Sequence, residues 1–102
     1  MAPELQQLLA QPWPDGKRVL VSFLWDGEGP VDVELTLRSA AGDPWAQMLV
    51  VGLNEPRMDL TLHLRVPVLP GAEGTVTARL LQGETEADSR VAAFVLPGDP
   101  TP

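Results

Sequence analysis

Apolar and polar residues alternate with a period of two along much of this chain, and the longest such segment covers residues 58–69. Its even-numbered positions from 58 to 68 are all apolar, and its odd-numbered positions from 59 to 65 are all polar. A helix with about 3.6 residues per turn would distribute those apolar residues around its axis, so the alternation indicates a β-strand with one buried face. We predict a central or near-central strand whose pairing ends at Pro67, which has no backbone donor.

Five shorter segments also have strand character, and turns rich in glycine and proline separate them. Residues 31–38 repeat the regular alternation, whereas 18–25, 47–53, 75–82 and 90–96 are apolar on one or both faces. Strands spaced about ten residues apart with turn residues between them are typical of a sandwich. The predicted fold is therefore all-β, an antiparallel β-sandwich of six or seven strands.

The amino-terminal residues have a different pattern. Leu5, Leu8 and Leu9 are spaced as i, i+3 and i+4 behind a proline and an acid, which favours the first turns of a helix. A Pro-Trp-Pro-Asp-Gly turn at 12–16 then ends the helix. We predict a short helix over residues 4–10, packed at one edge of the sandwich. The expected organisation is an amino-terminal helix or leader over 1–12, a sandwich domain over 13–97 and a disordered tail over 98–102.

Composition narrows the classes of partner and chemistry. The 102 residues are enough for one domain with its own core, and the absence of cysteine excludes disulfides, thiolate metal sites and thiol nucleophiles. The formal net charge of −7 argues against nucleic acid as a partner. No apolar run approaches the ~20 residues that a membrane-spanning helix needs, and the first residues do not form a secretory leader. We expect the chain as given to be soluble.

Catalytic and metal chemistry have little support in this sequence. The single histidine, His63, lies on the polar side of the 58–69 segment, where a solvated side chain is the simplest interpretation. Four acidic residues at positions 26, 28, 32 and 34 crowd one turn, but they lack the spacing of a calcium-binding loop. We expect no catalytic residue, no metal site and no cofactor, and we do not expect an enzyme.

Several strands are apolar on both faces, and their surplus residues are candidates for binding a partner. The candidates are Leu20 and Leu24, Leu49 and Val51, and Phe94 and Leu96. The alternative is that the amino-terminal helix or the opposite sheet covers them. Because a short helix with three leucines cannot cover three strands, we expect at least one of these pairs to stay partly exposed.

Four segments of the chain resemble the YscW-like family of type III secretion pilotin lipoproteins. They are VDVELTLR (31–38), AQMLVV (46–51), LTLHLRVP (60–67) and GTVTARLLQG (74–83). The resemblance implies a pilotin that binds the C-terminal segment of a secretin and assists its targeting and assembly. It also implies a lipid anchor on the periplasmic face of the outer membrane, although the residues given include neither a signal peptide nor a lipidated cysteine. We expect the domain to be a monomer.

Two other functions remain open. One is an envelope lipoprotein of the same fold without a secretin partner, and the other is a small inhibitor or carbohydrate-binding sandwich. A carbohydrate site would need exposed aromatic residues. Trp13, Trp25 and Trp45 fall in turns or at strand ends, where capping the core explains them.

Overall fold

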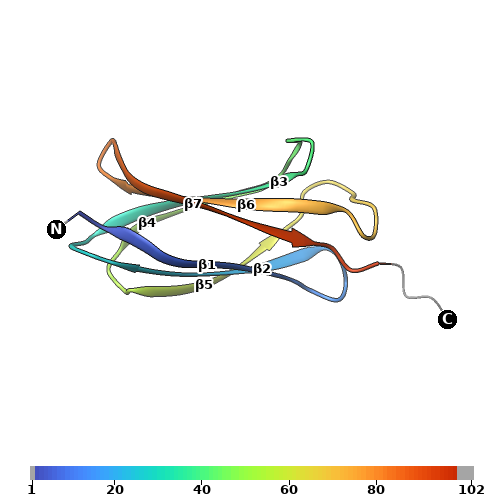
Figure 1. The fold of residues 1–102 in the computed structure, drawn as a ribbon, viewed down its shortest axis with the longest axis horizontal. Helices are drawn as coiled ribbons and strands as arrows, with labels where there is room; N and C mark the ends of the chain where they lie inside the picture. Colours follow the sequence, from blue (N-terminus) through green and yellow to red (C-terminus); the bar gives the residue numbers. More distant parts are fainter. Residues whose placement is uncertain (1, 99–102) are drawn as a thin grey trace.

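The computed structural model describes residues 2–98, which form seven antiparallel strands in two sheets (Figure 1). The strands are β1 (Glu4–Pro12), β2 (Arg18–Asp26), β3 (Val31–Ser39), β4 (Pro44–Leu53), β5 (Arg57–His63), β6 (Glu73–Gln82) and β7 (Thr85–Val95). The first sheet has the strand order β1-β2-β5, and the second sheet has the order β4-β3-β6-β7. The predicted all-β sandwich is confirmed, and each of its six predicted strands is present. Within residues 2–98 no helix has the length and apolar character to cross a membrane.

The fourth strand determines which edges the sandwich leaves open. In the constant-type immunoglobulin arrangement, the fourth strand completes the sheet formed by the first, second and fifth strands. Here β4 pairs with β3 instead. As a result, β4 and β5 are edge strands of different sheets on one side of the molecule, and β1 and β7 are the edge strands on the other side.

The predicted amino-terminal helix is wrong, because residues 4–12 form the edge strand β1, which pairs with β2. A β-bulge between Leu5 and Gln7 inserts Gln6 as an extra residue. Residues three apart lie on opposite faces of a regular strand, but the bulge allows both Leu5 and Leu8 to face the core. The spacing that resembled a helix is therefore that of a bulged strand. Residues 99–102 of the predicted tail lie outside the described residues.

The longest alternating segment is not a central strand. β5 pairs with β2 alone, so it is the edge of its sheet, and it ends at His63 rather than at Pro67. Beyond that point the chain moves towards the second sheet, where the amide of Arg65 donates a hydrogen bond to the carbonyl oxygen of Trp45 in β4 at 2.8 Å. Of its six alternate apolar residues only Leu62 is fully buried.

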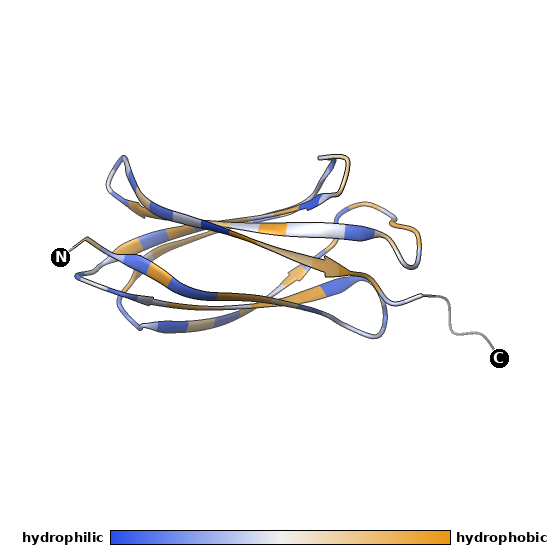
Figure 2. Ribbon diagram, in the orientation of Figure 1, coloured by the Kyte–Doolittle hydropathy of each residue, from blue (hydrophilic) through white to orange (hydrophobic). Residues whose placement is uncertain are grey.

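The core lies between the sheets, and three strands with neighbours on both sides supply most of it. Hydrophobic and hydrophilic positions alternate along β6 (Figure 2) and in the sequence of β3, whereas β2 is apolar on both faces. On these three strands the fully buried residues are Val19, Val21 and Phe23 of β2, Val31, Val33, Leu35 and Leu37 of β3, and Val76, Ala78 and Leu80 of β6. Burial of one valine-, leucine- or phenylalanine-sized side chain contributes roughly 1.5–3 kcal/mol. The inward faces of β2, β3 and β6 are therefore the main source of hydrophobic stability.

Phe94 and Leu96, one of the three candidate pairs for binding a partner, belong to this core instead, so the alternative that they are covered holds for them. They are only 6% and 2% exposed. The ring of Phe94 lies 6.1 Å from that of Trp45, measured between centroids, and the two rings are tilted by 56°. Phe94 pairs with Gly74 on β6, and the missing side chain there leaves room for both rings.

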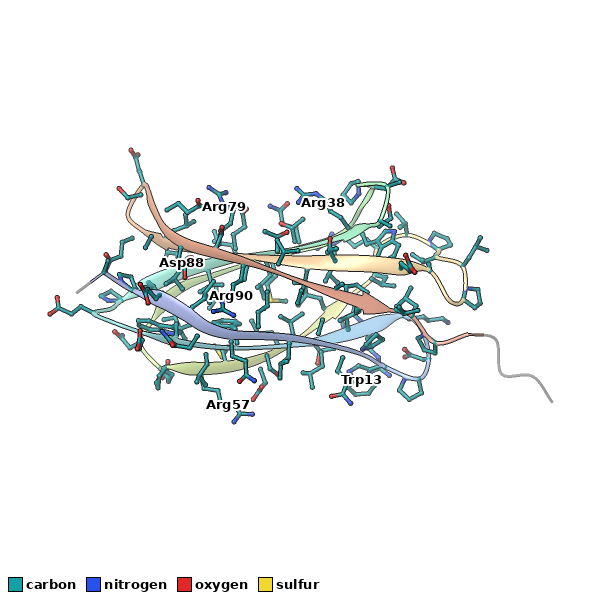
Figure 3. All side chains as sticks on the ribbon, viewed as in Figure 1. Trp13, Arg38, Arg57, Arg79, Asp88 and Arg90 are labelled. Atoms are coloured by element: carbon teal, nitrogen blue, oxygen red, sulfur yellow. The ribbon has the colours of Figure 1, made fainter. Side chains whose placement is uncertain are left out.

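The two sides of the sandwich are closed to different extents. On one side β1 lies against β7, and the carboxylate of Asp88 accepts a hydrogen bond from the amide of Leu5 at 2.8 Å (Figure 3). On the other side, between β4 and β5, the inward residues Met48 and Leu60 are only half-buried. The β1–β7 side is therefore covered, whereas the β4–β5 seam is partly open.

Candidate binding surfaces

Within residues 2–98, the polar side chains are either exposed to solvent or hydrogen-bonded within the fold. His63 is exposed at the end of β5. Residues 2–98 contain no group of three or more histidine, aspartate or glutamate side chains that could hold a metal ion. In the same residues, every buried side-chain nitrogen and oxygen has a hydrogen-bond partner.

The acidic residues between β2 and β3 do not converge on one point. Asp26 accepts a hydrogen bond from the side chain of Gln6 at 3.1 Å, and Asp32 accepts one from the amide of Gly52 at 3.0 Å. Glu34 pairs with Arg79 at 3.1 Å. The carboxylates of Asp26, Asp32 and Glu34 thus have separate structural partners, which explains why their closeness in sequence does not produce a binding loop.

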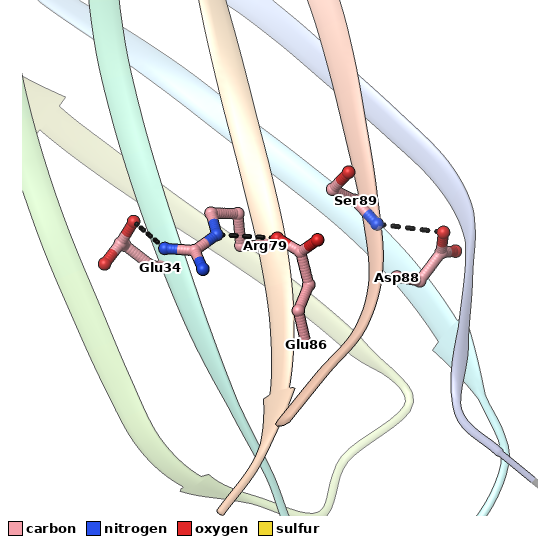
Figure 4. A network of polar contacts seen from close by, with 5 residues as sticks. All are labelled: Glu34, Arg79, Glu86, Asp88 and Ser89. Carbon is pink, nitrogen blue, oxygen red and sulfur yellow. Dashed lines mark hydrogen bonds and ion pairs between the residues drawn. The ribbon is translucent and has the colours of Figure 1, made fainter. Parts of the chain in front are cut away.

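Arg79 joins three neighbouring strands on the outer face of the second sheet. Its guanidinium contacts Glu86 of β7 at 2.6 Å and Glu34 of β3 at 3.1 Å (Figure 4). The hydrogen bonds that Arg79 donates to Glu86 and Glu34 raise the pKa of Arg79 above its usual value. An arginine is charged at any physiological pH, with or without this rise in its pKa. The network therefore positions side chains and does not titrate.

The turn between β1 and β2 is ordered by a second charged group. The amide of Lys17 donates to a carboxylate oxygen of Asp15 at 2.9 Å and, with help from Arg18, holds the pKa of Asp15 below its usual value. Arg18 pairs with Asp15 at 2.8 Å and also stacks on Trp13, 3.9 Å from the ring centroid. One face of the Trp13 ring is therefore already covered by a guanidinium.

The three tryptophans do not form an aromatic platform. Trp25 and Trp45 are 3% and 5% exposed, so the expectation that they cap the core is confirmed. The indole nitrogen of Trp25 donates to the carbonyl oxygen of Glu55 at 2.7 Å and ties the turn after β4 to the first sheet. Among the tryptophans, this leaves Trp13 as the one with substantial exposure.

Three leucines gather on the outer face of the first sheet. Leu20 and Leu24 point away from the core because the alternate residues of β2 point into it, and both are half-buried. Leu9 of β1 pairs with Ser22, the residue midway between them, so it is the diagonal neighbour of both. β1 lies beside β2 and not over it, so the predicted helical cover is absent. We call Leu9, Leu20 and Leu24 the leucine face.

A second exposed group lies on β4. Leu49 and Val51 are 57% and 70% exposed on the outer face of the second sheet. This confirms that one of the predicted pairs stays exposed. β4 pairs with β3 along one edge, and within residues 2–98 no strand pairs with its other edge. We call residues 46–51, with this unpaired edge, the β4 edge.

Sequence reasoning missed two groups of exposed residues. Leu9 was assigned to a helix, although it is 53% exposed on a strand. Val91 and Val95 of β7 are 64% and 59% exposed, whereas the candidates for exposure in this part of the chain were Phe94 and Leu96, on either side of Val95. The end of β7 is apolar at almost every position (Figure 2), so a period of two could not indicate which face is buried.

Comparisons with known proteins concern the fold. No family model and no curated protein matches the sequence. Solved structures do match: a glycosyl hydrolase family 2 member from Bacteroides cellulosilyticus has a TM-score of 0.67 at 16% identity. A β-glucuronidase from Parabacteroides merdae has a TM-score of 0.71 at 13% identity, and a putative β-galactosidase from Bacteroides fragilis has 0.68 at 15%.

The matches are to a small part of each of these enzymes. They cover 93%, 93% and 91% of this chain, but only 15%, 13% and 17% of the three glycosidases in the same order. At such low identities, the likeness concerns the backbone arrangement and carries no catalytic residue. The chain therefore has a β-sandwich fold that also occurs as one part of larger glycosidases.

Proposed function

We propose that this chain is a non-catalytic binding domain that docks a segment of another protein on the leucine face. The observation that carries the proposal is the gathering of Leu9, Leu20 and Leu24 on the outer face of a sheet. The outer face of an antiparallel sheet normally presents polar residues to water. An apolar patch with a polar rim is typical of an interaction site, and Arg57 and Asp59 of β5 supply part of that rim.

An amphipathic helix with basic flanks is the segment that this surface fits best. Apolar residues on one stripe of a helix can cover the three leucines, which is one of the common ways to bind a disordered segment. The net charge of −7 favours a segment that carries lysine or arginine, because charge complementarity accelerates association and selects partners.

The first candidate partner is the C-terminal segment of a type III secretion secretin. The resemblance of four strand segments to pilotin lipoproteins supports this candidate. In that role the domain would sit at the periplasmic face of the outer membrane through an amino-terminal lipid and would assist assembly of the secretin. The solved structures named above are glycosidases, and none of them is a pilotin.

A second candidate is a supporting domain within a larger polypeptide. The glycosidases favour it, because this sandwich corresponds to 13–17% of their chains. A neighbouring domain would then cover the leucine face. Carbohydrate binding has less support, because Trp25 and Trp45 are buried and Arg18 covers one face of Trp13.

The double substitution Leu20→Glu, Leu24→Glu tests the leucine face. We expect the melting temperature to stay within a few degrees of the unmodified protein, because both side chains are only half-buried and lie on the outer face of the sheet, away from the core. Binding of a secretin C-terminal peptide should weaken by at least about 30-fold, since two carboxylates would be desolvated against its apolar stripe. Isothermal titration calorimetry measures the affinity of the peptide for the unmodified chain and for the double variant.

Val91→Glu, Val95→Glu is the matched control, because it adds the same charges to exposed apolar positions of the other sheet. Unchanged affinity in the Leu20, Leu24 variant would rule out the leucine face. If the unmodified chain binds no secretin peptide, the pilotin proposal fails. A pull-down from an envelope fraction, comparing the unmodified chain with both variants, then tests the broader proposal of a binding domain.

A further inference from the structure

The β4 edge lacks the features that usually prevent two edge strands from pairing. Charged side chains, prolines and bulges commonly protect edges. Residues 44–53 contain no charged side chain, whereas β1, β5 and β7, the other edge strands, all carry charges. The proline and the register shifts of β4 lie at its two ends, so Ala46–Val50 pairs regularly with β3 and presents an edge without a bulge.

Apolar side chains lie on both sides of this edge. Leu49 and Val51 are exposed on the outer face. On the inner side, Met48 and Leu60 are half-buried at the seam between the sheets, and a hollow of about 250 Å³ opens there, bordered in part by Leu62. A strand added to the β4 edge would therefore bury apolar surface on both of its faces and would also satisfy the unpaired backbone groups of β4.

Residues of opposite charge lie beyond the two ends of β4. Arg65 is next to its start, because its amide is bonded to the carbonyl oxygen of Trp45. Glu55 lies just past its end, in the turn that follows Leu53. Within residues 2–98 neither side chain forms an ion pair. When two identical strands pair antiparallel, the start of each lies beside the end of the other, so opposite charges meet at both ends.

We propose that two copies of this chain associate through antiparallel pairing of their β4 strands, about a two-fold axis near Met48 or Leu49. The second sheet then continues from one copy into the other. The contact is self-complementary, as a two-fold interface requires. It brings no charges of the same sign together along β4, which matters for a chain of net charge −7. Arg65 of each copy approaches Glu55 of the second copy.

This dimer is independent of the proposed function. The leucine face and the β4 edge belong to different sheets, so both leucine faces remain open in the dimer. The inference replaces the monomer expected from the sequence. A segment of an unrelated protein would gain the same backbone hydrogen bonds, but a second copy also supplies the matching charge at each end of the strand.

Sedimentation equilibrium over about 1–100 μM tests the association. The unmodified chain should form dimers within this range, and Leu49→Lys, Val51→Lys should remain monomeric with little change in melting temperature. Val91→Lys, Val95→Lys is the matched control on the far edge of the same sheet, and it should still dimerise. A monomeric unmodified chain, a dimer that survives the β4 substitutions or a dimer lost in the control would each overturn the proposal.

Charge reversal tests the antiparallel arrangement. Arg65→Glu alone or Glu55→Arg alone should weaken the dimer by about tenfold, because each creates two repulsive contacts in place of two attractive ones. The two substitutions together should restore the original dissociation constant. If the double variant is as weak as the single variants, the two ends do not meet as proposed.

Single cysteines report the register, because the chain has none of its own. Residues directly opposite in antiparallel strands have Cα atoms about 4.5–5.5 Å apart, within the range of a disulfide. Oxidation should cross-link Met48→Cys or Leu49→Cys most efficiently, and Val91→Cys very little. Equal cross-linking at these positions would indicate random collision and would contradict the proposed axis.

Discussion

At the scale of single residues, the absence of a side chain at Gly74 shapes one end of the core. A Cβ atom there would meet the ring of Trp45 and would lie 2.9 Å from both the carbonyl oxygen of Arg38 and the ring of Phe94. The carbonyl belongs to the paired strand β3 and cannot move without disturbing the ladder. Glycine is required here for space, because two aromatic rings and a neighbouring backbone occupy the position of a side chain.

We predict that Gly74→Ala lowers the free energy of unfolding by about 1–3 kcal/mol, the usual cost of overpacking a core. Chemical denaturation measures the change. Gly98→Ala is the control, because nothing lies within 4 Å of its added Cβ, and it should be nearly neutral. Equal stability of the two variants would show that Trp45 and Phe94 can move aside without cost.

At the scale of elements, β1 shows how a bulge can imitate a helix. Leu5 and Leu8 are three residues apart, as on a helix, yet both face the core because Gln6 is an extra residue in the strand. From Leu8 to Pro12 the strand then runs in regular register with β2 and closes one side of the first sheet. Helix propensity is a weak local preference of a few tenths of a kcal/mol per residue, and backbone pairing with β2 together with burial of Leu5 and Leu8 outweighs it.

Deletions on either side of the bulge should therefore have very different effects. Deletion of Gln6 removes the extra residue, leaves Leu5 and Leu8 facing the core and should cost less than about 1 kcal/mol. Deletion of Leu9 turns Leu8 towards solvent and Gln7 towards the core, and it should cost about 3 kcal/mol or more. Thermal and urea denaturation compare the two variants. Similar losses would mean that β1 can change register freely.

At the scale of the whole molecule, the sheets are held together by residues that face each other across the core. β5 contributes to the core although it is an edge strand, because Leu62, which pairs with Val19 of β2, is only 2% exposed and belongs to the core. The adjacent residue His63 points to solvent. Each strand of the sandwich thus has a core face and a solvent face, and neighbouring positions can differ greatly in their effect on stability.

Leu62→Asp should prevent folding or cost more than about 4 kcal/mol, because it places an unpaired carboxylate in the core. His63→Ala, one residue away, should leave the melting temperature almost unchanged. Circular dichroism and thermal denaturation make the comparison. A folded Leu62→Asp variant of near-normal stability would mean that the seam near β5 admits water more deeply than its burial indicates.

The sequence by itself determined six of the seven strands, all except β1, and for residues 31–38 it also determined which residues face the core. Residues 31–38 are the clearest case, because side chains alternate across a strand by local geometry and strictly alternating hydrophobicity then selects the buried face. The position of Trp25 and Trp45 at strand ends also indicated that they cap the core, and Leu49 and Val51 were one of three candidate pairs, of which at least one was expected to stay partly exposed. The sequence also selected Leu20 and Leu24, which the structure places at the surface beside Leu9.

Only the tertiary structure decided which strands are edges, which face of a doubly apolar strand is covered, and where the exposed leucines meet. Pairing and burial depend on residues far apart in the chain, so no local pattern contains them. Phe94 faces inward because Gly74 leaves space for its ring, and β4 is an edge because it pairs with β3 alone. Leu9 joins Leu20 and Leu24 because β1 pairs beside β2 in a register that places Leu9 opposite Ser22.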